Sequence, residues 1–507
     1  MIISLSVLVI TIIVSGTYAL YKAQLSKNIG VNTTTHGLAY YINYVKGTDI
    51  TAATLNPSTS YEGGASSDIE FWKKDDSYDI YGKIELTVNT IGTNLSNSPA
   101  LKYAVVNNGN VLKEGSLKGT TSGSKVTILK NLYLEQTKQI YTVYVWLDNS
   151  EELGNISNES LSISVDCTAS LQKEPTAADT IISLYTSAAK VTATNNSITY
   201  NTAPSVSLMN DRLGGTTTSL DGGNIRYYGA SPNNYIYFNC SDYSNQTSST
   251  CETWRIIGVF DGKLKLIRGS QIGKYSWDNK NTSTGAENNY GKNDWTTARL
   301  MKLLNPRDYY KVDSNDNNLG QSLYYNSASG KCYSGQNNAT VDCDFTSTGI
   351  KNDETRNMIA ETTYYLGGWN SYSVYPNEIY EYERGTTVYT GRPPTWPGKI
   401  ALAYPSDYGY AADLNQCKDK TLYDYDNSTC TSNNWMKAIL GTSSHGWLLT
   451  PRSGGSYNAW NVYSGGYVGS TYLAYYAIGA VPVLSLSSKL GIESGDGSSS
   501  NPYKLSA

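Results

Sequence analysis

Trp447–Gly455 (WLLTPRSGG) and Ala459–Tyr463 (AWNVY) are the stretch of this chain that best defines a fold. Short apolar runs are separated here by Gly-rich turns, which is typical of antiparallel strands. Period-two alternation in AWNVY places the tryptophan and valine on one face of a strand and the asparagine and tyrosine on the other. We therefore expect Trp460 to lie in the core, and Asn461 and Tyr463 to face outward.

Tyrosine, serine, glycine and asparagine dominate the segment around this strand. Binding loops favour these residues, because tyrosine gives rigid contact area and the small polar residues give adaptable hydrogen bonds. The alternative is that the tyrosines lie on the surface of a stable hairpin and bind nothing. The pattern favours binding, and the expected ligand contacts are Tyr457, Asn458, Asn461, Tyr463, Tyr467, Tyr472, Tyr475 and Tyr476.

The same ending resembles the C-type-lectin-like modules of bacterial surface proteins. That group includes retroelement-diversified variable proteins and relatives of the formylglycine-generating enzyme fold. Its ending runs W-x-x-(S/T)-x-x-S, A-W-x-V, a G-x-V turn and G-V-R-P-V. The matching positions here are Trp447, Ser453, Ala459, Trp460, Val462, Gly466, Val468, Gly479, Pro482 and Val483. Val481 stands where the group usually has arginine. The resemblance implies a C-type-lectin-like domain that binds a ligand, without the oxidase activity, whose reactive cysteine arrangement has no counterpart at this end.

Residues 26–172 carry the pattern of a β-sandwich. Ile80–Val88 alternates apolar and polar residues, Leu101–Leu112 contains an Asn-Asn-Gly turn, and Ile140–Leu147 is rich in β-branched and aromatic residues. With the leader end Thr17–Tyr21 and the segment Tyr144–Asp148, this region resembles camelysin-like exported proteins of Gram-positive bacteria. The resemblance implies a cell-surface or matrix component. The chain has no HExxH motif, so the peptidase activity in the family's name is not expected.

Residues 1–25 are expected to be a signal peptide or an N-terminal membrane anchor. The run Ile2–Leu20 carries no charge, and Lys22 and Lys27 follow it. Positive charge after the run would by itself favour a cytoplasmic body. The cysteines favour export, since their spacing is typical of disulfide-bonded proteins in an oxidising compartment. We expect an extracellular protein, either held at the cell surface or secreted.

Six of the seven cysteines fall into close pairs along the chain. Fifteen pairings of six cysteines are possible, and the spacing favours three local loops. The expected pairs are Cys240 with Cys251, Cys332 with Cys343, and Cys417 with Cys430. Cys167 is left over, and it is interpreted as a buried thiol, the alternative being an intermolecular bridge.

The remainder divides into a linker at 173–220 and a disulfide-stapled α+β recognition domain at 221–507. A short helix is expected over Asp179–Lys190, and loops over 192–220. Within the domain, Trp254–Ile267 predicts a hairpin around an Asp-Gly turn. Trp295–Leu304 and Glu354–Leu366 have helical spacing. The expected fold class is therefore mainly β with minor α.

Several activities are disfavoured by the composition. A net charge of −4 without a basic stripe argues against a nucleic-acid partner. His445 lies beside serines but outside any nucleophile-elbow motif, and the glutamates at 378, 381 and 383 are interpreted as a solvated acidic loop. The segment from Asp313 to Tyr324 lacks the glycine and glutamate of an EF-hand. We expect no enzyme activity, no metal and no cofactor.

The expected function is adhesion-like binding of an extracellular glycan or protein. The N-terminal segment would contact the membrane if it is not cleaved. One alternative is a structural subunit of a surface fibre or biofilm matrix. Another is a carbohydrate-active enzyme that uses carboxylates the sequence does not locate.

Overall fold

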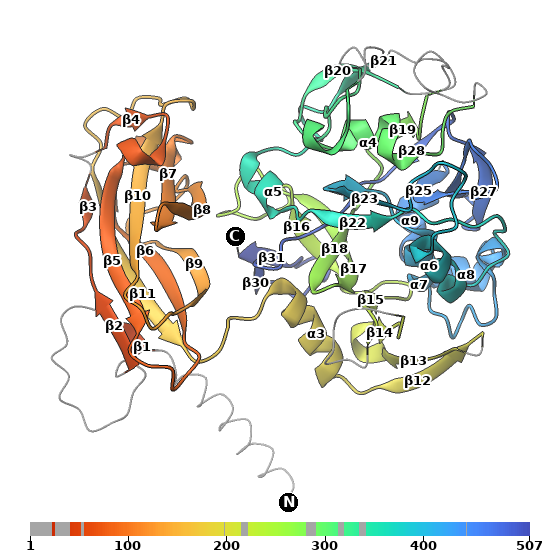
Figure 1. Ribbon diagram of the computed structural model, residues 1–507, viewed down its shortest axis with the longest axis horizontal. Coiled ribbons are helices and arrows are strands. Elements are labelled where there is room, and N and C mark those ends of the chain that lie inside the picture. Colours follow the sequence, from red (N-terminus) through yellow and green to blue (C-terminus); the bar gives the residue numbers. More distant parts are fainter. Residues whose placement is uncertain are drawn as a thin grey trace, which may run out of the picture. The chain divides into compact units, whose positions relative to one another are not determined.

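The computed structural model describes residues 23–25, 41–51, 55–196, 198–213, 222–279, 290–312, 319–333, 341–442 and 444–506. The chain forms two compact units, Met1–Glu174 and Pro175–Ala507 (Figure 1). Strands predominate over helices in both, which confirms the expected class of mainly β with minor α. The apolar run Ile2–Leu20 lies outside the described residues. Among the residues that are described, no helix is long and apolar enough to cross a membrane.

The first unit contains two antiparallel-rich sheets. One has the order β1-β11-β6-β9, with β3 added to β11. Its strands are β1 (Ala23–Leu25), β3 (Ile50–Thr51), β6 (Tyr81–Ile91), β9 (Lys125–Tyr133) and β11 (Leu161–Ser170). The other has the order β2-β5-β10-β7-β8, with β4 parallel to β10. Its strands are β2 (Ile42–Val45), β4 (Pro57–Ser58), β5 (Ala65–Lys73), β7 (Leu101–Asn107), β8 (Asn110–Ser116) and β10 (Ile140–Asp148).

Alternate side chains of the two sheets fill one shared core. Ile84 and Leu86 of β6 and Val143 and Val145 of β10 are fully buried in the same cluster. The short helices η3 (Tyr61–Gly63) and α2 (Thr93–Asn97) lie between strands. This two-sheet packing confirms the sandwich pattern expected from period-two alternation. Cys167 lies in this core with no exposed surface, as a free buried thiol, so an intermolecular bridge through it is not supported.

The second unit is organised around two larger sheets. The nine-stranded sheet has the order β12-β13-β14-β15-β17-β18-β29-β24, with β16 added to β17. Its strands are β12 (Val191–Asn195), β13 (Ile198–Ala203), β14 (Leu208–Asn210), β15 (Ile225–Tyr227), β16 (Tyr235–Phe238), β17 (Glu252–Phe260), β18 (Lys263–Arg268), β24 (Ile400–Ala401) and β29 (Val483–Ser485). The five-stranded sheet has the order β19-β28-β25-β26-β27. Its strands are β19 (Gly273–Ser276), β25 (Gly446–Pro451), β26 (Asn458–Val462), β27 (Val468–Leu473) and β28 (Ala477–Ala480).

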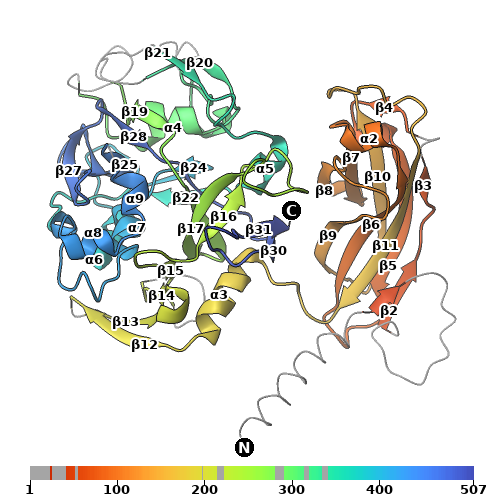
Figure 2. The ribbon, with the colours of Figure 1, turned by 180° about the vertical axis from the view of Figure 1, so that it is seen from behind.

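Short paired strands and helices complete this unit. The pairs are β20 (Ser329–Cys332) with β21 (Val341–Asp344), β22 (Thr362–Tyr365) with β23 (Thr395–Gly398), and β30 (Gly491–Ser494) with β31 (Lys504–Ser506). The α-helices are α3 (Ala177–Ser187), α4 (Arg299–Leu304), α5 (Asp353–Met358), α6 (Pro376–Arg384), α7 (Pro405–Tyr410), α8 (Ser428–Ser432) and α9 (Lys437–Leu440). The 3₁₀ turns are η4 (Pro204–Val206), η7 (Trp295–Thr297), η8 (Arg307–Tyr309) and η9 (Leu422–Asp424). Figure 2 shows α6 to α9 gathered near β25 and β27.

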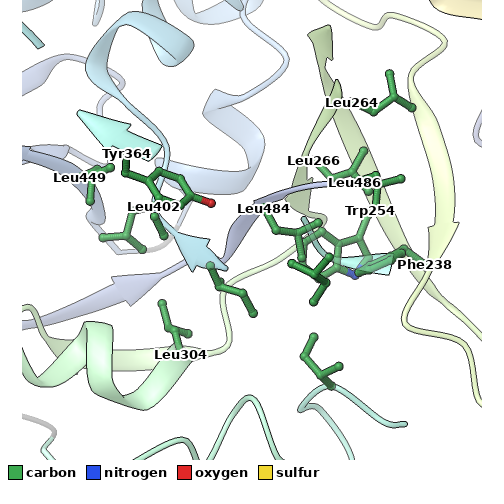
Figure 3. Close-up of a cluster of buried hydrophobic side chains, with 14 of the residues drawn as sticks. Phe238, Trp254, Leu264, Leu266, Leu304, Tyr364, Leu402, Leu449, Leu484 and Leu486 are labelled. Carbon is green, nitrogen blue, oxygen red and sulfur yellow. The ribbon is translucent and has the colours of Figure 1, made fainter. Parts of the chain in front are cut away.

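Large apolar side chains from distant segments meet in the core of the second unit. Phe238 and Trp254 are in edge-to-face contact, with ring centroids 5.2 Å apart. Leu484 and Leu486 from the end of the chain lie in the same cluster (Figure 3). The predicted hairpin Trp254–Ile267 is confirmed as β17 and β18. All three expected disulfides are present: Cys240–Cys251, Cys332–Cys343 and Cys417–Cys430.

Three expectations about local structure are wrong. Residues 192–220 are not all loop, since β12, β13 and β14 pair in the nine-stranded sheet and join the former linker to the second unit. The helix expected over Glu354–Leu366 ends at Met358, because the β-branched and aromatic Thr362–Tyr365 pairs with β23. The acidic stretch around Glu383 is helix α6 rather than a solvated loop, and Glu383 itself is fully buried.

Candidate functional site

A continuous row of aromatic rings runs across the β26–β27 hairpin and the loops beside it. Each ring contacts the next, with centroid separations of 4.7, 5.7, 4.2, 5.6, 5.0, 4.7, 6.1 and 5.0 Å in order. We call this the aromatic row, and its members in spatial order are Tyr372, Tyr423, Tyr467, Tyr463, Tyr472, Tyr476, Tyr475, Tyr290 and Tyr457. His445 joins it from the side, 4.5 Å from the ring of Tyr463 and 5.2 Å from that of Tyr472.

The centre of the row depends on the hairpin. The rings of Tyr463 and Tyr467 are stacked at an interplanar angle of 12° across the turn that joins β26 to β27. A Cβ at Gly469 would come within 2.4 Å of the Tyr463 ring, so glycine is needed there to let the ring lie over β27. Gly466 has a φ of +104°, which favours glycine. The buried hydroxyl of Tyr408 donates to the Gly466 carbonyl at 2.6 Å and fixes the turn from below.

The two ends of the row come from other parts of the sequence. Tyr423 lies in η9 and contacts Tyr372, which precedes α6. At the opposite end, the backbone carbonyl of Tyr475 accepts from the Ser276 hydroxyl of β19 at 2.7 Å. The ring of Tyr290 then bridges Tyr475 and Tyr457. Contacts between residues far apart in the chain therefore assemble the row.

The row is open to solvent along much of its length. Tyr423 is 48% exposed and Tyr290 is 41% exposed. The rings of Tyr457, Tyr463, Tyr467, Tyr472 and Tyr476 are half-buried. Only Tyr475 is buried. Half-buried rings combine a fixed position with an accessible face or edge, which is the arrangement that binding surfaces require.

The row is electrically neutral near pH 7. Burial raises the pKa of Tyr463, Tyr467 and Tyr472 above the ordinary phenol value, so these hydroxyls stay protonated. Burial also lowers the pKa of His445. The Nδ1 atom of His445 accepts from the backbone N–H of Ser464 at 3.0 Å, so the neutral ring carries its proton on Nε2. The row thus offers neutral hydroxyl and N–H groups beside aromatic faces.

Of the expected ligand contacts, the six tyrosines belong to the row and the two asparagines do not. Asn458 is 7% exposed, and its Nδ2 donates to the carbonyl of Thr471 at 2.9 Å, which ties the hairpin together. Asn461 has no exposed surface, so the expectation that it faces outward is wrong. It is paired in register with Trp447 of β25, which is also fully buried. Trp460 and Val462 are fully buried, as expected.

Four aromatic residues of the site were missed by the sequence analysis. Tyr290, Tyr372 and Tyr423 lie outside the segment that resembles a known group, and no local pattern links them to it. His445 was interpreted as a loop residue rather than a catalytic one, and it lies directly before β25, which begins at Gly446. An exposed tyrosine carries no sequence signal of its neighbours when those neighbours lie on other elements.

Charged side chains form a separate, fully buried network away from solvent. Arg226 bonds to Asp211 at 2.5 Å and to Asp407 at 3.1 Å, and Lys265 bonds to Asp407 at 2.5 Å. Glu383 accepts from the backbone N–H and the hydroxyl of Ser406. Burial raises the pKa of Glu383 to about 7. These groups join β15, β18, α6 and α7, and all of them are buried.

No metal centre is found in the part of the chain that the structure describes, where no group of three or more His, Cys, Asp or Glu side chains could hold an ion. Residues 313–318 of the stretch that was compared with an EF-hand lie outside the described residues. Ser444 donates its hydroxyl to Gln271 at 2.9 Å, and Ser443 is not described. The described contacts of His445 are thus with aromatic rings and the Ser464 backbone rather than with a nucleophile.

Comparison with known proteins does not place this chain in a family. No family model matches, and no curated protein matches. A receptor-binding domain of botulinum neurotoxin mosaic serotype C/D is 11% identical, with 52% of this chain and 75% of that chain covered and a TM-score of 0.15. The PBCV-1 virus capsid is 12% identical, with 43% and 59% covered and a TM-score of 0.13. A mutant of HCR/D is 12% identical, with 50% and 75% covered and a TM-score of 0.15. At such scores these likenesses define neither a family nor a function.

Proposed function

We propose that this protein is an exported, adhesion-like surface protein that binds a glycan along the aromatic row. The observation that carries the proposal is the unbroken contact of nine tyrosine rings, most of them partly open to solvent. Sugar rings present C–H faces that stack on aromatic faces, and their hydroxyls bond to neutral polar groups. An uncharged, extended surface of this kind suits a neutral chain of sugars better than a charged peptide.

The three disulfides support an extracellular setting, because such bonds persist in oxidising compartments. The resemblance of the chain's ending to C-type-lectin-like modules of bacterial surface proteins also supports an extracellular setting. A protein ligand remains the alternative for this surface, since tyrosine-rich surfaces serve both classes. If the N-terminal segment is retained as an anchor, the binding unit would be held at the membrane.

Retention on immobilised polysaccharides tests the proposal with the full chain and with residues 175–507. Both should bind a neutral polysaccharide, and the double variant Tyr472→Ala, Tyr475→Ala should not. The matched double variant Tyr472→Phe, Tyr475→Phe keeps the rings and should retain most binding. In the full chain, Tyr78→Ala removes a 44% exposed ring outside the row and should have no effect. Equal retention of the alanine and phenylalanine variants would contradict the proposal, and glycan turnover would show an enzyme instead.

A fibre subunit is the second candidate, and one feature of the first unit favours it. Among the described strands, β8 is the terminal strand of its sheet, and it exposes Val111 (43%) and Leu112 (38%). Exposed edges of this kind can pair with another chain. Lys113 and Glu114 on the same strand oppose such pairing. Electron microscopy of concentrated full chain should show fibres if this role is correct, and Val111→Lys should abolish them.

A further inference from the structure

The second unit contains a cavity that shares no residue with the aromatic row. Its volume is about 460 Å³, and it lies between β16, β17, β18 and the helix α9. Its polar walls are Arg255, Arg268, Glu252 and Ser270, and Ile439 of α9 supplies apolar surface. The cavity is therefore large enough for a small molecule or the end of a larger one.

Arg255 is the unusual group in this cavity. Its side chain lies in β17 and the residue is only 8% exposed. The guanidinium carbon lies 3.7 Å from the ring centroid of Tyr235 and 4.8 Å from that of Trp435. These rings hold the guanidinium plane in one orientation, and its charge interacts favourably with their faces.

The hydrogen bonds of Arg255 leave part of its guanidinium open. Nε donates to Oδ1 of Asn234 at 2.5 Å, and Nη2 donates to the carbonyl of Pro232 at 3.3 Å. Tyr235 is a further side-chain hydrogen-bond partner of the guanidinium. Within the described ranges, no carboxylate lies within ion-pair distance of Arg255. Three of the five N–H protons thus have partners, and two are left to a further acceptor.

The second arginine of the cavity, Arg268, has a carboxylate partner, in contrast to Arg255. Arg268 forms a bidentate pair with Glu252, with Nε–Oε2 and Nη2–Oε1 both at 3.0 Å. Two guanidinium groups and one carboxylate leave one positive charge in the cavity, and it resides on Arg255. Burial without a counter-charge lowers the pKa of Arg255 to about 10. A buried charge without a partner is costly, and a bound anion would offset that cost.

Ser270 adds a second donor at the cavity. Its hydroxyl oxygen accepts from Nη1 of Arg268 at 2.9 Å, so its own proton remains available. One fixed planar charge with a free pair of donors matches a carboxylate, which accepts two parallel N–H bonds. A dianion such as phosphate would bring one more negative charge than the cavity can neutralise.

We propose that this cavity is a carboxylate-binding site, in which Arg255 and Ser270 hold the carboxylate of a small organic acid such as a hexuronic acid. The site stands independently of the aromatic row, so either proposal can fail without the other. Arg255 acts as the recognising charge and Ile439 contacts the carbon skeleton.

Calorimetric titration of the full chain with D-glucuronate, D-glucuronamide and inorganic phosphate tests the site. Glucuronate should bind at least about tenfold more tightly than its neutral amide, which corresponds to one charge-assisted pair. Arg255→Lys keeps the charge but loses the planar fork, and it should weaken glucuronate binding about tenfold. Arg356→Lys is the control, because Arg356 lies over Tyr325 outside the cavity and should leave binding unchanged.

Ser270 is exposed, so Ser270→Ala keeps the test valid if the Arg255 variant does not fold. That variant should bind glucuronate several-fold more weakly. Equal binding of acid and amide would overturn the proposal, as would unchanged binding in both cavity variants. Tighter binding of phosphate than of glucuronate would overturn the assignment to carboxylates.

Discussion

Replacing Tyr408 by phenylalanine removes a single hydroxyl that supports the turn of the aromatic row. The Tyr408 side chain is fully buried, and its hydroxyl donates to the Gly466 carbonyl at 2.6 Å. The turn itself closes through Gly466 N–H to the Tyr463 carbonyl at 2.8 Å and Tyr463 N–H to the Tyr467 carbonyl at 2.9 Å. The Tyr408 bond therefore holds the segment from which two stacked rings of the row project.

The expected loss of stability follows from what remains after the substitution. Phenylalanine keeps the packing of the ring, but the carbonyl of Gly466 loses the phenol as its donor. An unsatisfied buried acceptor costs about 1–3 kcal/mol in the free energy of unfolding. Glycan binding should weaken about tenfold or more, because the pair Tyr463–Tyr467 is no longer held in one position.

Tyr425→Phe is a matched control for this change. Tyr425 is also fully buried, its ring centroid is 6.2 Å from that of Tyr408, and its hydroxyl donates to the carbonyl of Gly409 at 3.2 Å. That carbonyl keeps a second donor, the N–H of Ala412 at 3.3 Å, and lies in α7 rather than in the turn. We expect a loss of only about 0.5–1.5 kcal/mol and unchanged glycan binding.

Urea denaturation and polysaccharide retention measure the two effects separately. Tyr408→Phe should lower both stability and retention, whereas Tyr425→Phe should lower stability alone. If both variants lose stability equally and retain binding equally, the hydroxyl of Tyr408 does not organise the row, and the account of the turn is wrong.

Three further predictions concern the stability of the second unit. Arg226→Met leaves two buried aspartates without their arginine partner and should lower the free energy of unfolding, measured in urea, by about 3–5 kcal/mol. The control Lys331→Met, at an exposed ion pair, should lower it by less than about 1 kcal/mol. The pKa of Glu383 rises on folding from 4.5 to about 7, so the folded state binds more protons than the unfolded state between these pH values. The contribution of Glu383 to the free energy of unfolding therefore falls by up to about 3 kcal/mol as the pH rises from 4.5 through 7. Denaturation curves across that range should show the decline, and Glu383→Gln should flatten it. Replacing Cys417 and Cys430 together by serine opens a loop of 13 residues and should lower the melting temperature, at a cost of about 3 kcal/mol.

The sequence predicts the elements whose signals are local. Alternation and an Asn-Asn-Gly turn located the hairpin of β7 and β8, and cysteine spacing located all three disulfides. The three strands β12, β13 and β14 were missed, because Thr and Asn dominate them and resemble loop composition. Only β14 pairs with β15 of the larger sheet, whereas β12 and β13 pair with each other, so it was their polar composition rather than a distant partner that concealed them.

The candidate site was predicted in part for the same reason. The six tyrosines near the end of the chain lie within one resemblance and one composition bias, so the sequence could group them. Tyr290 joins the row through ring contacts with Tyr475 and Tyr457. Tyr423 joins it through ring contacts with Tyr467 and Tyr372. The cavity at Arg255 had no signal at all, since an arginine in a strand is ordinarily ion-paired or exposed. Only the fold shows that, among the described residues, this one has no ion pair and is buried.

Asn461 shows where the alternation rule fails and what the failure implies. Alternation predicts on which face of the sheet a side chain lies. That face is exposed to solvent only when no other part of the protein covers it. Here both faces of β26 are covered, and the Asn461 amide is fully buried without a hydrogen-bond partner in the described part of the chain. An unpaired buried amide costs about 1–3 kcal/mol, so an apolar residue of similar size would stabilise the hairpin. Asn461 lies on β26 two residues from Tyr463, directly opposite Gly469, over which the Tyr463 ring lies. The unpaired amide beneath the centre of the row therefore supports the proposal that this surface binds a ligand, because a hairpin built for stability alone would carry an apolar residue there.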